Sequence, residues 1–400
     1  MLPKANSKNK FIGGVAVLTV STAVVKLIGF LYKIPLIRLV GMEGMGYYLA
    51  AYHIYTVLLM LSSAGLPSAV SILVSKNLAM GKRRNAERVF DTSCVAFSIV
   101  GAICSAVLYI FSDRIAEAID IPNAAYCIRM IAPSIVFVSA GSAVKGYFQG
   151  KQNMMPTAMS YVIEAMSKLI VGLAFTCFAK NLGLDSAHVA AYAIASLSVS
   201  SFVSCAYLFF RKLKKEDTSF PYEVSDEPES FFCITKALLK VAIPISFVAL
   251  ITGFAGIADT LLISSRLQSA GIDEAYANIL YSSYGNLCVP VFALIPSLVS
   301  PIALSMIPMM ADASQRNDKK REKEIFSSAF RLCAAISIPA AIGMCVFSKE
   351  ILGFIFSNEE NAVSISAPLL SYLAPATFFS CFITLTNAVL QAYGKTGIQL

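Results

Sequence analysis

The chain has 400 residues, of which 57% are hydrophobic and only 14% are charged, and its mean hydropathy is +0.69. A soluble protein of this length usually carries charge on about a quarter of its residues. The composition therefore excludes an ordinary soluble domain and indicates a surface that faces lipid. The formal net charge of +8 would suit nucleic acid. Because the basic residues gather in loops between apolar segments, we expect no nucleic-acid partner.

Ten apolar segments are long enough to cross about 30 Å of hydrocarbon. The first follows Lys4, Lys8 and Lys10 directly and has no small-residue cleavage site behind it, so we interpret it as a retained span. The predicted spans, each good to a few residues, are 12–36, 47–74, 91–111, 126–148, 156–178, 189–210, 238–264, 279–310, 327–347 and 363–391.

Two kinds of loop alternate between these spans. One kind is rich in Lys and Arg and comprises the N-terminus, 76–88, Lys151, 211–215, 316–323 and Lys395. The other kind is short and nearly free of basic residues. Since positive loops stay in the cytoplasm, the pattern predicts a multi-pass protein of a bacterial plasma membrane with its N-terminus inside.

An internal repeat relates the two parts of the chain. The sequence APSIVFVSAGSAVKGYFQGK at 132–151 corresponds to APATFFSCFITLTNAVLQAYGK at 374–395, and the basic loops GKRRNAERVF and RNDKKREKEIF correspond as well. We therefore predict an all-α membrane helix bundle of two pseudo-symmetric six-helix lobes in the same orientation. The first lobe covers 1–215, a cytoplasmic linker 216–236 and the second lobe 237–400. On this count the second lobe has four helices and the start of a fifth, and we expect the chain to be truncated.

Four blocks of sequence resemble one family. Residues 25–74 and the blocks GYFQGKQNMMPTAMSYVIEAMSK (146–168), IADTLLISSRLQSAG (257–271) and YGNLCVPVFALIPSLVSPIALSMIPMMADA (284–313) are similar to the stage V sporulation protein B-like polysaccharide flippases. That family belongs to the multidrug/oligosaccharidyl-lipid/polysaccharide flippase superfamily. The resemblance implies two six-helix lobes and flipping of an undecaprenyl-pyrophosphate-linked saccharide, such as the peptidoglycan precursor lipid II. Related lipid II flippases carry further arginines where this chain reads TVLLMLSS and YGNLCVP, which leaves the saccharide open.

Several charges fall inside the predicted spans of the first half, where each costs about 2.5–3.5 kcal/mol on insertion scales. Cations outnumber carboxylates, so we expect a water-filled cationic cavity that binds an anionic headgroup. The candidate substrate-binding residues are Lys26, Lys33, Arg38, Lys145, Glu164 and Lys168. The alternatives are that Lys33 and Arg38 snorkel to the outer interface and that Glu164 and Lys168, one turn apart, form a structural ion pair.

Two further features concern coupling and motion. Asp259 could accept a coupling proton or cation, or equally make an interhelical hydrogen bond. Span eight carries Pro290, Pro296 and Pro301, which we interpret as hinge candidates, with passive curvature as the alternative. GMEGMG at 41–46 superficially resembles a phosphate loop, but no strand precedes it and we interpret it as a tight interhelical turn.

These features favour a flippase that works by alternating access, with no catalytic residues and no chemical step. A multidrug/cation antiporter on the same fold is the alternative, and it predicts a first half dominated by carboxylates. A membrane enzyme is a weak third reading because no acidic metal ligands cluster at one membrane face. We expect a monomer with a lipid-linked oligosaccharide and membrane lipids as partners, and with no metal or cofactor. Coupling to a Na⁺ or H⁺ gradient or to the membrane potential stays open.

Overall fold

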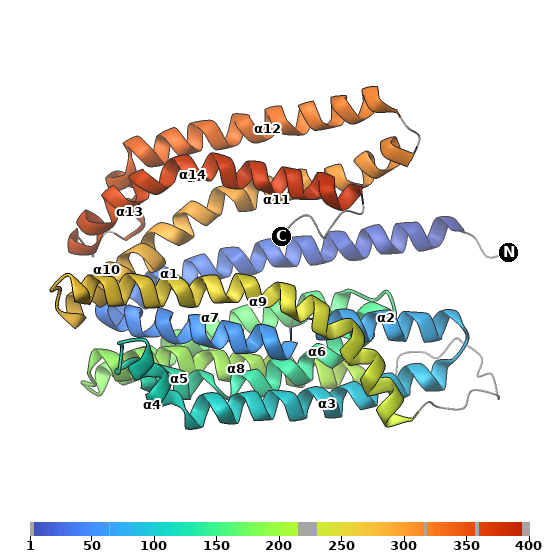
Figure 1. The fold of residues 1–400 in the computed structure, drawn as a ribbon, viewed down its shortest axis with the longest axis horizontal. Helices are drawn as coiled ribbons and strands as arrows, with labels where there is room; N and C mark the ends of the chain where they lie inside the picture. The colour runs from blue at the N-terminus through green and yellow to red at the C-terminus, as the bar shows by residue number, and fades with distance from the viewer. Residues whose placement is uncertain (1–3, 64, 215–229, 316–317, 357–359, 394–400) are drawn as a thin grey trace. The chain divides into compact units, whose positions relative to one another are not determined.

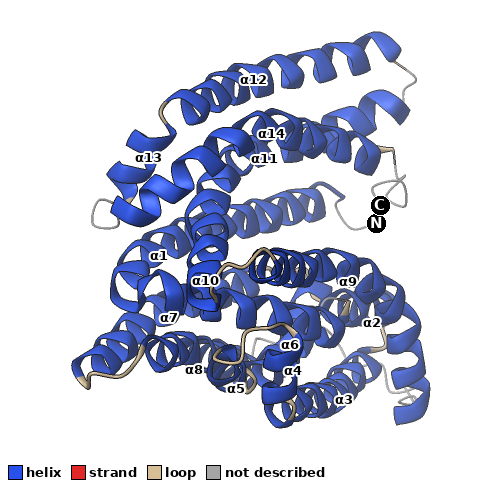
Figure 2. Ribbon diagram, turned by 60° about the vertical axis from the view of Figure 1, so that its left-hand side comes forward, coloured by secondary structure: helices blue, strands red, loops and turns tan. Residues whose placement is uncertain are grey.

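The computed structural model describes residues 4–63, 65–214, 230–315, 318–356 and 360–393, and within these ranges the regular elements are all helical (Figures 1 and 2). This confirms the predicted all-α class. The residues form two compact units, 1–278 and 279–400. The predicted lobe boundary stays a prediction, because residues 215–229 of the linker region lie outside the described ranges.

The first unit contains nine helices and the beginning of a tenth within the described residues. They are α1 (Lys4–Ser63), α2 (Leu66–Ala79), α3 (Arg83–Ile110), α4 (Ser112–Ala118), α5 (Ala124–Ile131), α6 (Ser134–Gly150), α7 (Met155–Asn181), α8 (Ser186–Leu213), α9 (Phe231–Ser269) and the start of α10 (Glu274–Ser282). The second unit holds the end of α10, a π-helical turn η1 (Ser283–Cys288), α11 (Val289–Gln315), α12 (Lys319–Val346), α13 (Ser348–Ile355) and α14 (Glu360–Ala392).

Seven stretches among the described residues are long and apolar enough to cross a membrane: 83–110, 124–150, 155–181, 186–213, 274–300, 319–346 and 360–390. Each contains or overlaps one of the predicted spans, and the protein is a multi-pass membrane protein. The other three predicted spans lie in α1, α2 and α9.

Helix α1 passes through the first two predicted spans and is broken at Gly41, whose φ of 79° and ψ of 164° are not helical. A positive φ costs little for glycine because it has no Cβ. The predicted turn at 41–46 is thus reduced to one residue. The second predicted span, 47–74, is not one helix: α1 ends at Ser63 and α2 begins at Leu66, where Pro67 fits the first turn.

The core of the first unit forms where α2, α3, α6, α8 and α9 meet. Small residues let two of these helices approach closely, as is common between membrane helices. Gly146 and Gly150 stand one turn apart on α6 and face α2. A Cβ built at Gly146 would lie 2.6 Å from the Pro67 carbonyl oxygen, and one at Gly150 would lie 2.8 Å from Val74 Cβ.

The same three residue types meet in each unit, and we call each group a carboxylate latch. In the first unit the Tyr147 hydroxyl donates to Glu87, and Lys212 Nζ lies 2.5 Å from the same carboxylate and 4.0 Å from the Tyr147 ring centroid. Glu87 lies in the first turns of α3, and Tyr147 lies near the end of α6.

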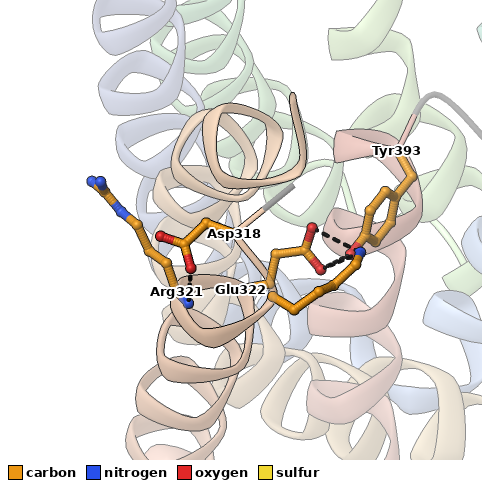
Figure 3. Close-up of polar contacts among 5 residues, drawn as sticks. Asp318, Arg321, Glu322 and Tyr393 are labelled. Carbon is orange, nitrogen blue, oxygen red and sulfur yellow. Dashed lines mark hydrogen bonds and ion pairs between the residues drawn. The ribbon is translucent and has the colours of Figure 1, made fainter. Parts of the chain in front are cut away.

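In the second unit the Tyr393 hydroxyl donates to Glu322 Oε2 at 2.8 Å, and Lys319 Nζ lies 3.0 Å from that oxygen. Figure 3 shows Tyr393 meeting the Glu322 carboxylate while the Arg321 guanidinium extends away. Glu322 lies in the first turn of α12, and Tyr393 directly follows α14. Both latches thus join the start of one long helix to the end of another, which extends the sequence repeat to side-chain contacts.

The contact between α2 and α6 generates a stability prediction. Gly146→Ala adds a Cβ against backbone that cannot move aside, so we expect about 1–3 kcal/mol of destabilisation. The measurement is the thermal unfolding midpoint in detergent, followed by thiol-reactive dye labelling of buried cysteines such as Cys127 and Cys205. Gly343→Ala in α12 is the control, because a Cβ there would meet nothing within 4 Å. Equal midpoints for the two variants would contradict the close contact.

Candidate functional site

The first unit contains a half-open cavity of about 490 Å³, lined by residues of α1, α2, α6, α7 and α8. This volume lies within the range of about 300–1,000 Å³ that is typical of small-molecule sites. Three of the predicted site residues, Lys145, Glu164 and Lys168, line it together. Four tyrosines complete its polar wall: Tyr32, Tyr52, Tyr55 and Tyr161.

Helical periodicity explains why these residues share one cavity. On α7, residues 161, 164, 165 and 168 recur every three or four positions and so occupy one face. On the first part of α1, residues 25, 28, 29 and 32 do the same. Lys145 comes from α6, where its side chain is buried with 7% of its surface exposed. Three separate helices therefore contribute the charged and aromatic groups.

Aromatic rings hold the two ammonium groups of the cavity. Lys145 Nζ lies 4.5 Å from the ring centroid of Tyr161, and Lys168 Nζ lies 5.5 Å from that of Tyr32 and 6.0 Å from that of Tyr52. A cation within about 6 Å of a ring face is attracted to its negative quadrupole. Both lysines are thus positioned by ring faces.

Glu164 is the one carboxylate among the residues that line this cavity. Its Oε1 accepts a hydrogen bond of 3.4 Å from the Ser201 hydroxyl. Among the described side chains, no ion pair joins Glu164 to Lys168, so the direct pairing allowed by their spacing is not seen. The cavity therefore combines two ammonium groups with one carboxylate and has a net positive charge.

The three predicted cations of α1 lie outside the cavity wall. Lys26 and Arg38 are exposed on the surface of the unit, and the Arg38 carbonyl accepts a hydrogen bond of 3.3 Å from Lys180 Nζ. Lys33 is half-buried and lies close enough to Lys168 for their charges to interact. Substrate contacts by these three residues stay predictions.

Asp259 lies on α9 beside α1, where its charge acts on His53. His53 Nδ1 is 3.0 Å from Thr260 Oγ1, a hydrogen bond that joins residues 207 positions apart. His53 thus joins α1 to α9 through a side-chain contact. Among the residues that the structure describes, no group of three His, Cys, Asp or Glu side chains is arranged to hold a metal ion.

The hinge candidates lie on α11 of the second unit, where Pro290 is the second residue. The π-helical turn η1 ends at Cys288, immediately before α11 begins. Proline has no N–H, so residue 290 cannot donate the α-helical hydrogen bond to the carbonyl of residue 286. Single π turns inside helices frequently occur at functional sites. Pro296 and Pro301 follow within the same helix, and a hinge there stays a prediction.

The tyrosines of the cavity were not predicted from the sequence. A signal was available, because Tyr161 stands three and seven residues before Glu164 and Lys168 on the same helix. Tyr52 and Tyr55 carried no such signal, since only folding of α1 about Gly41 brings its second part to the cavity.

A cavity that carries two ammonium groups and one carboxylate, lined by helices of a multi-pass membrane protein, is typical of a transporter rather than of a soluble domain. The family model described as polysaccharide biosynthesis protein matches residues 11–314, and the chain belongs to this family. A second family model, MatE, matches residues 282–400. The family assignment confirms the resemblance drawn from residues 25–74 and the three later blocks.

Curated relatives cover nearly the whole chain. The lipid II flippase MurJ of Bacillus subtilis (strain 168) is 25% identical over 401 residues, which covers 97% of this chain and 73% of the relative. Stage V sporulation protein B of the same organism is 24% identical over 399 residues, which covers 98% of this chain and 75% of the relative.

Solved structures establish the same fold. An inward-facing multidrug resistance MATE family transporter of the MOP superfamily matches with a TM-score of 0.72 at 14% identity, covering 96% of this chain and 86% of that chain. The lipid II flippase MurJ in an inward closed conformation matches with a TM-score of 0.70 at 13% identity, covering 96% and 77%. The predicted all-α membrane helix bundle is thus confirmed as the fold that these transporters share.

The charge of the cavity generates a binding prediction. Glu164→Gln removes the cavity's carboxylate without changing its shape, so inorganic pyrophosphate should bind about threefold tighter or more, because like-charge repulsion is removed. Quenching of tyrosine fluorescence measures this in a chain without tryptophan. Glu117→Gln, on α4 and outside the cavity lining, is the matched control and should leave the affinity unchanged. An unchanged affinity in Glu164→Gln would contradict binding of the anion in this cavity.

Proposed function

We propose that this protein is a flippase that carries an undecaprenyl-pyrophosphate-linked saccharide, lipid II or a related polysaccharide precursor, across the cytoplasmic membrane. The observation that carries the proposal is the cavity in which Lys145 and Lys168 outnumber Glu164. A pyrophosphate offers several anionic oxygens to two ammonium groups and compensates their charge. The family of the chain and the names of the two Bacillus relatives support the same substrate class.

Transport on this proposal involves binding and movement but no chemical step. The saccharide and pyrophosphate leave the aqueous side for the polar cavity while the polyprenyl tail stays in lipid. The lysines replace the water and counter-ions that the pyrophosphate loses. Alternating access then presents the headgroup to the other side, with the N-terminus cytoplasmic and the chain acting as a monomer.

The competing proposal is a multidrug/cation antiporter, which the MATE-type fold would also allow. An organic cation would need carboxylates or open ring faces. In this cavity the ring faces of Tyr32, Tyr52 and Tyr161 already hold lysine ammonium groups, which would repel a second cation. The charge balance therefore favours an anionic substrate.

Energy coupling is proposed to act through Asp259, next to His53 on α1. A proton or Na⁺ at Asp259 would change the charge between α1 and α9. Coupling to the membrane potential is the alternative, since movement of a charged headgroup across the membrane depends on that potential.

The substrate test measures binding of undecaprenyl-pyrophosphate-linked saccharide to the purified protein, with a cationic dye as competitor. Lys168→Ala or Lys145→Ala should weaken binding at least tenfold, about 1.4 kcal/mol. Lys180→Ala is the control, because Lys180 is exposed and lies outside the cavity lining. Lys26→Ala in parallel tests that predicted contact. Preference for the dye, with no effect of Lys145 or Lys168, would favour the antiporter.

The hinge test concerns Pro290, which follows the π-helical turn. Pro290→Ala supplies an N–H that can form the missing α-helical hydrogen bond, so the turn should convert toward a regular α-helix. If bending here serves alternating access, transport into proteoliposomes should slow severalfold while substrate affinity stays unchanged. Pro339→Ala, inside α12, is the matched control. Unchanged transport in Pro290→Ala would assign the proline to passive curvature.

A further inference from the structure

Glu164 is unexpected in a cavity that binds an anion, because its negative charge weakens the binding of any anion. Glu164 lies on α7 one turn before Lys168, a rise of about 6 Å along the helix axis. Its contact in the described structure is the long hydrogen bond from Ser201. Most of the lone pairs of this carboxylate are therefore available to a ligand in the cavity. A pyrophosphate alone cannot use them, because both groups are negative. A ligand group with several hydroxyl donors would use that capacity.

The tyrosines divide into buried supports and an accessible surface. Tyr32 and Tyr55 are buried, with 3% and 4% of their surface exposed, whereas Tyr52 is 37% exposed. The Tyr52 ring stacks against Tyr48, with centroids 6.5 Å apart and planes 12° apart, and lies 6.0 Å from Tyr55. Its position is thus fixed by neighbours on its own helix. Tyr161 is half-buried on the α7 side of the cavity.

Each accessible ring has an ammonium group over it. Lys168 lies over Tyr52 as well as over the buried Tyr32, and Lys145 lies over Tyr161. A pyrophosphate attracts an ammonium group more strongly than a ring face does, because it carries full negative charges. When the lysines turn to the anion, the two ring faces become free. The apolar C–H face of a pyranose ring can then pack on them, since an aromatic face is both apolar and weakly negative.

Serine hydroxyls provide further partners for a sugar. Ser142 and Ser200 line the cavity, and their hydroxyls donate to the carbonyls of Val138 and Leu197 at 2.8 and 3.1 Å. Each hydroxyl oxygen keeps lone pairs that can accept from a sugar hydroxyl. The cavity therefore holds ammonium groups, acceptor oxygens and aromatic rings together.

We propose that Tyr52, Tyr161 and Glu164 form a saccharide subsite next to the lysines, which selects a pyrophosphate that carries a pyranose sugar over the bare polyprenyl pyrophosphate. The rings pack on the sugar, and Glu164 accepts from its hydroxyls. This inference rests on the proposed flippase function. It adds that the cavity distinguishes a loaded carrier lipid from the spent one.

The experiment compares two probes, undecaprenyl pyrophosphate and undecaprenyl-pyrophosphate-linked N-acetylglucosamine, on the purified full chain in nanodiscs. The measured quantity is the ratio of their dissociation constants. Wild type should bind the sugar-bearing lipid about tenfold tighter, and Tyr52→Leu and Tyr161→Leu should reduce that ratio to about one to three. Tyr52→Phe keeps the ring and should keep the ratio. Tyr109→Leu, an exposed tyrosine of α3, is the control for loss of a surface ring.

The lysine variants separate this inference from the function on which it rests. Lys168→Ala should weaken the binding of both probes by similar factors and leave the ratio of their dissociation constants nearly unchanged. A wild-type ratio near one, with both probes still dependent on Lys168, would overturn the saccharide subsite and leave the flippase proposal standing. Saturable binding of neither probe would overturn both. An equal loss of affinity for both probes in Tyr52→Leu would also overturn the subsite, and Tyr52 would then only position Lys168.

Discussion

The structure of the first unit depends on how it accommodates two ammonium groups inside a membrane-spanning bundle. Each charge costs about 2.5–3.5 kcal/mol at the centre of a membrane helix, and a cation–π contact returns about 0.5–2 kcal/mol. The ring faces under Lys145 and Lys168 therefore offset much of that cost. A bound anion would compensate the remaining positive charge, which is why the proposed substrate is anionic.

Close packing around the cavity keeps its wall in place. Helix α6 has two faces with different tasks: Lys145 reaches the cavity, while Gly146 and Gly150 let the helix lie directly against α2. Backbone contact of this kind leaves little freedom for α6 to rotate. At its end, Tyr147 joins α6 to α3 through Glu87. These contacts fix the helix that carries Lys145, and the Tyr161 ring then holds its ammonium group.

The sequence predicted the helical class and most of the spans, which follow from hydropathy. The spacing of Glu164 and Lys168 on one helix predicted their common face, and the excess of cations placed Lys145 in the same candidate site. The sequence did not predict that Lys26 would be exposed, because hydropathy defines a span but not the rotation of the helix about its own axis. It also missed the contact of His53 with Thr260 and the part played by Tyr52. Both depend on how α1 continues beyond Gly41 and which helices then lie beside it.

The two carboxylate latches are a second feature that the sequence alone could not predict. Repeated motifs predicted related halves, and each half indeed joins a glutamate, a tyrosine and a lysine. Yet Lys212 comes from α8, two helices beyond Tyr147, whereas Lys319 lies one turn before Glu322. The arrangement of charges is repeated although the chain positions are not. A comparison of the halves by sequence alone would miss this equivalence.

The π-helical turn before Pro290 has a consequence for the reading of related sequences. A wide turn holds one residue more than an α-helical turn, so side chains on its two sides are offset by about 100° from the positions that an unbroken helix would give them. The apolar stripe of residues 279–310 therefore changes phase near residue 285. An alignment of this segment with a regular α-helix would require a one-residue gap there. Homologues that lack the gap should have a regular helix.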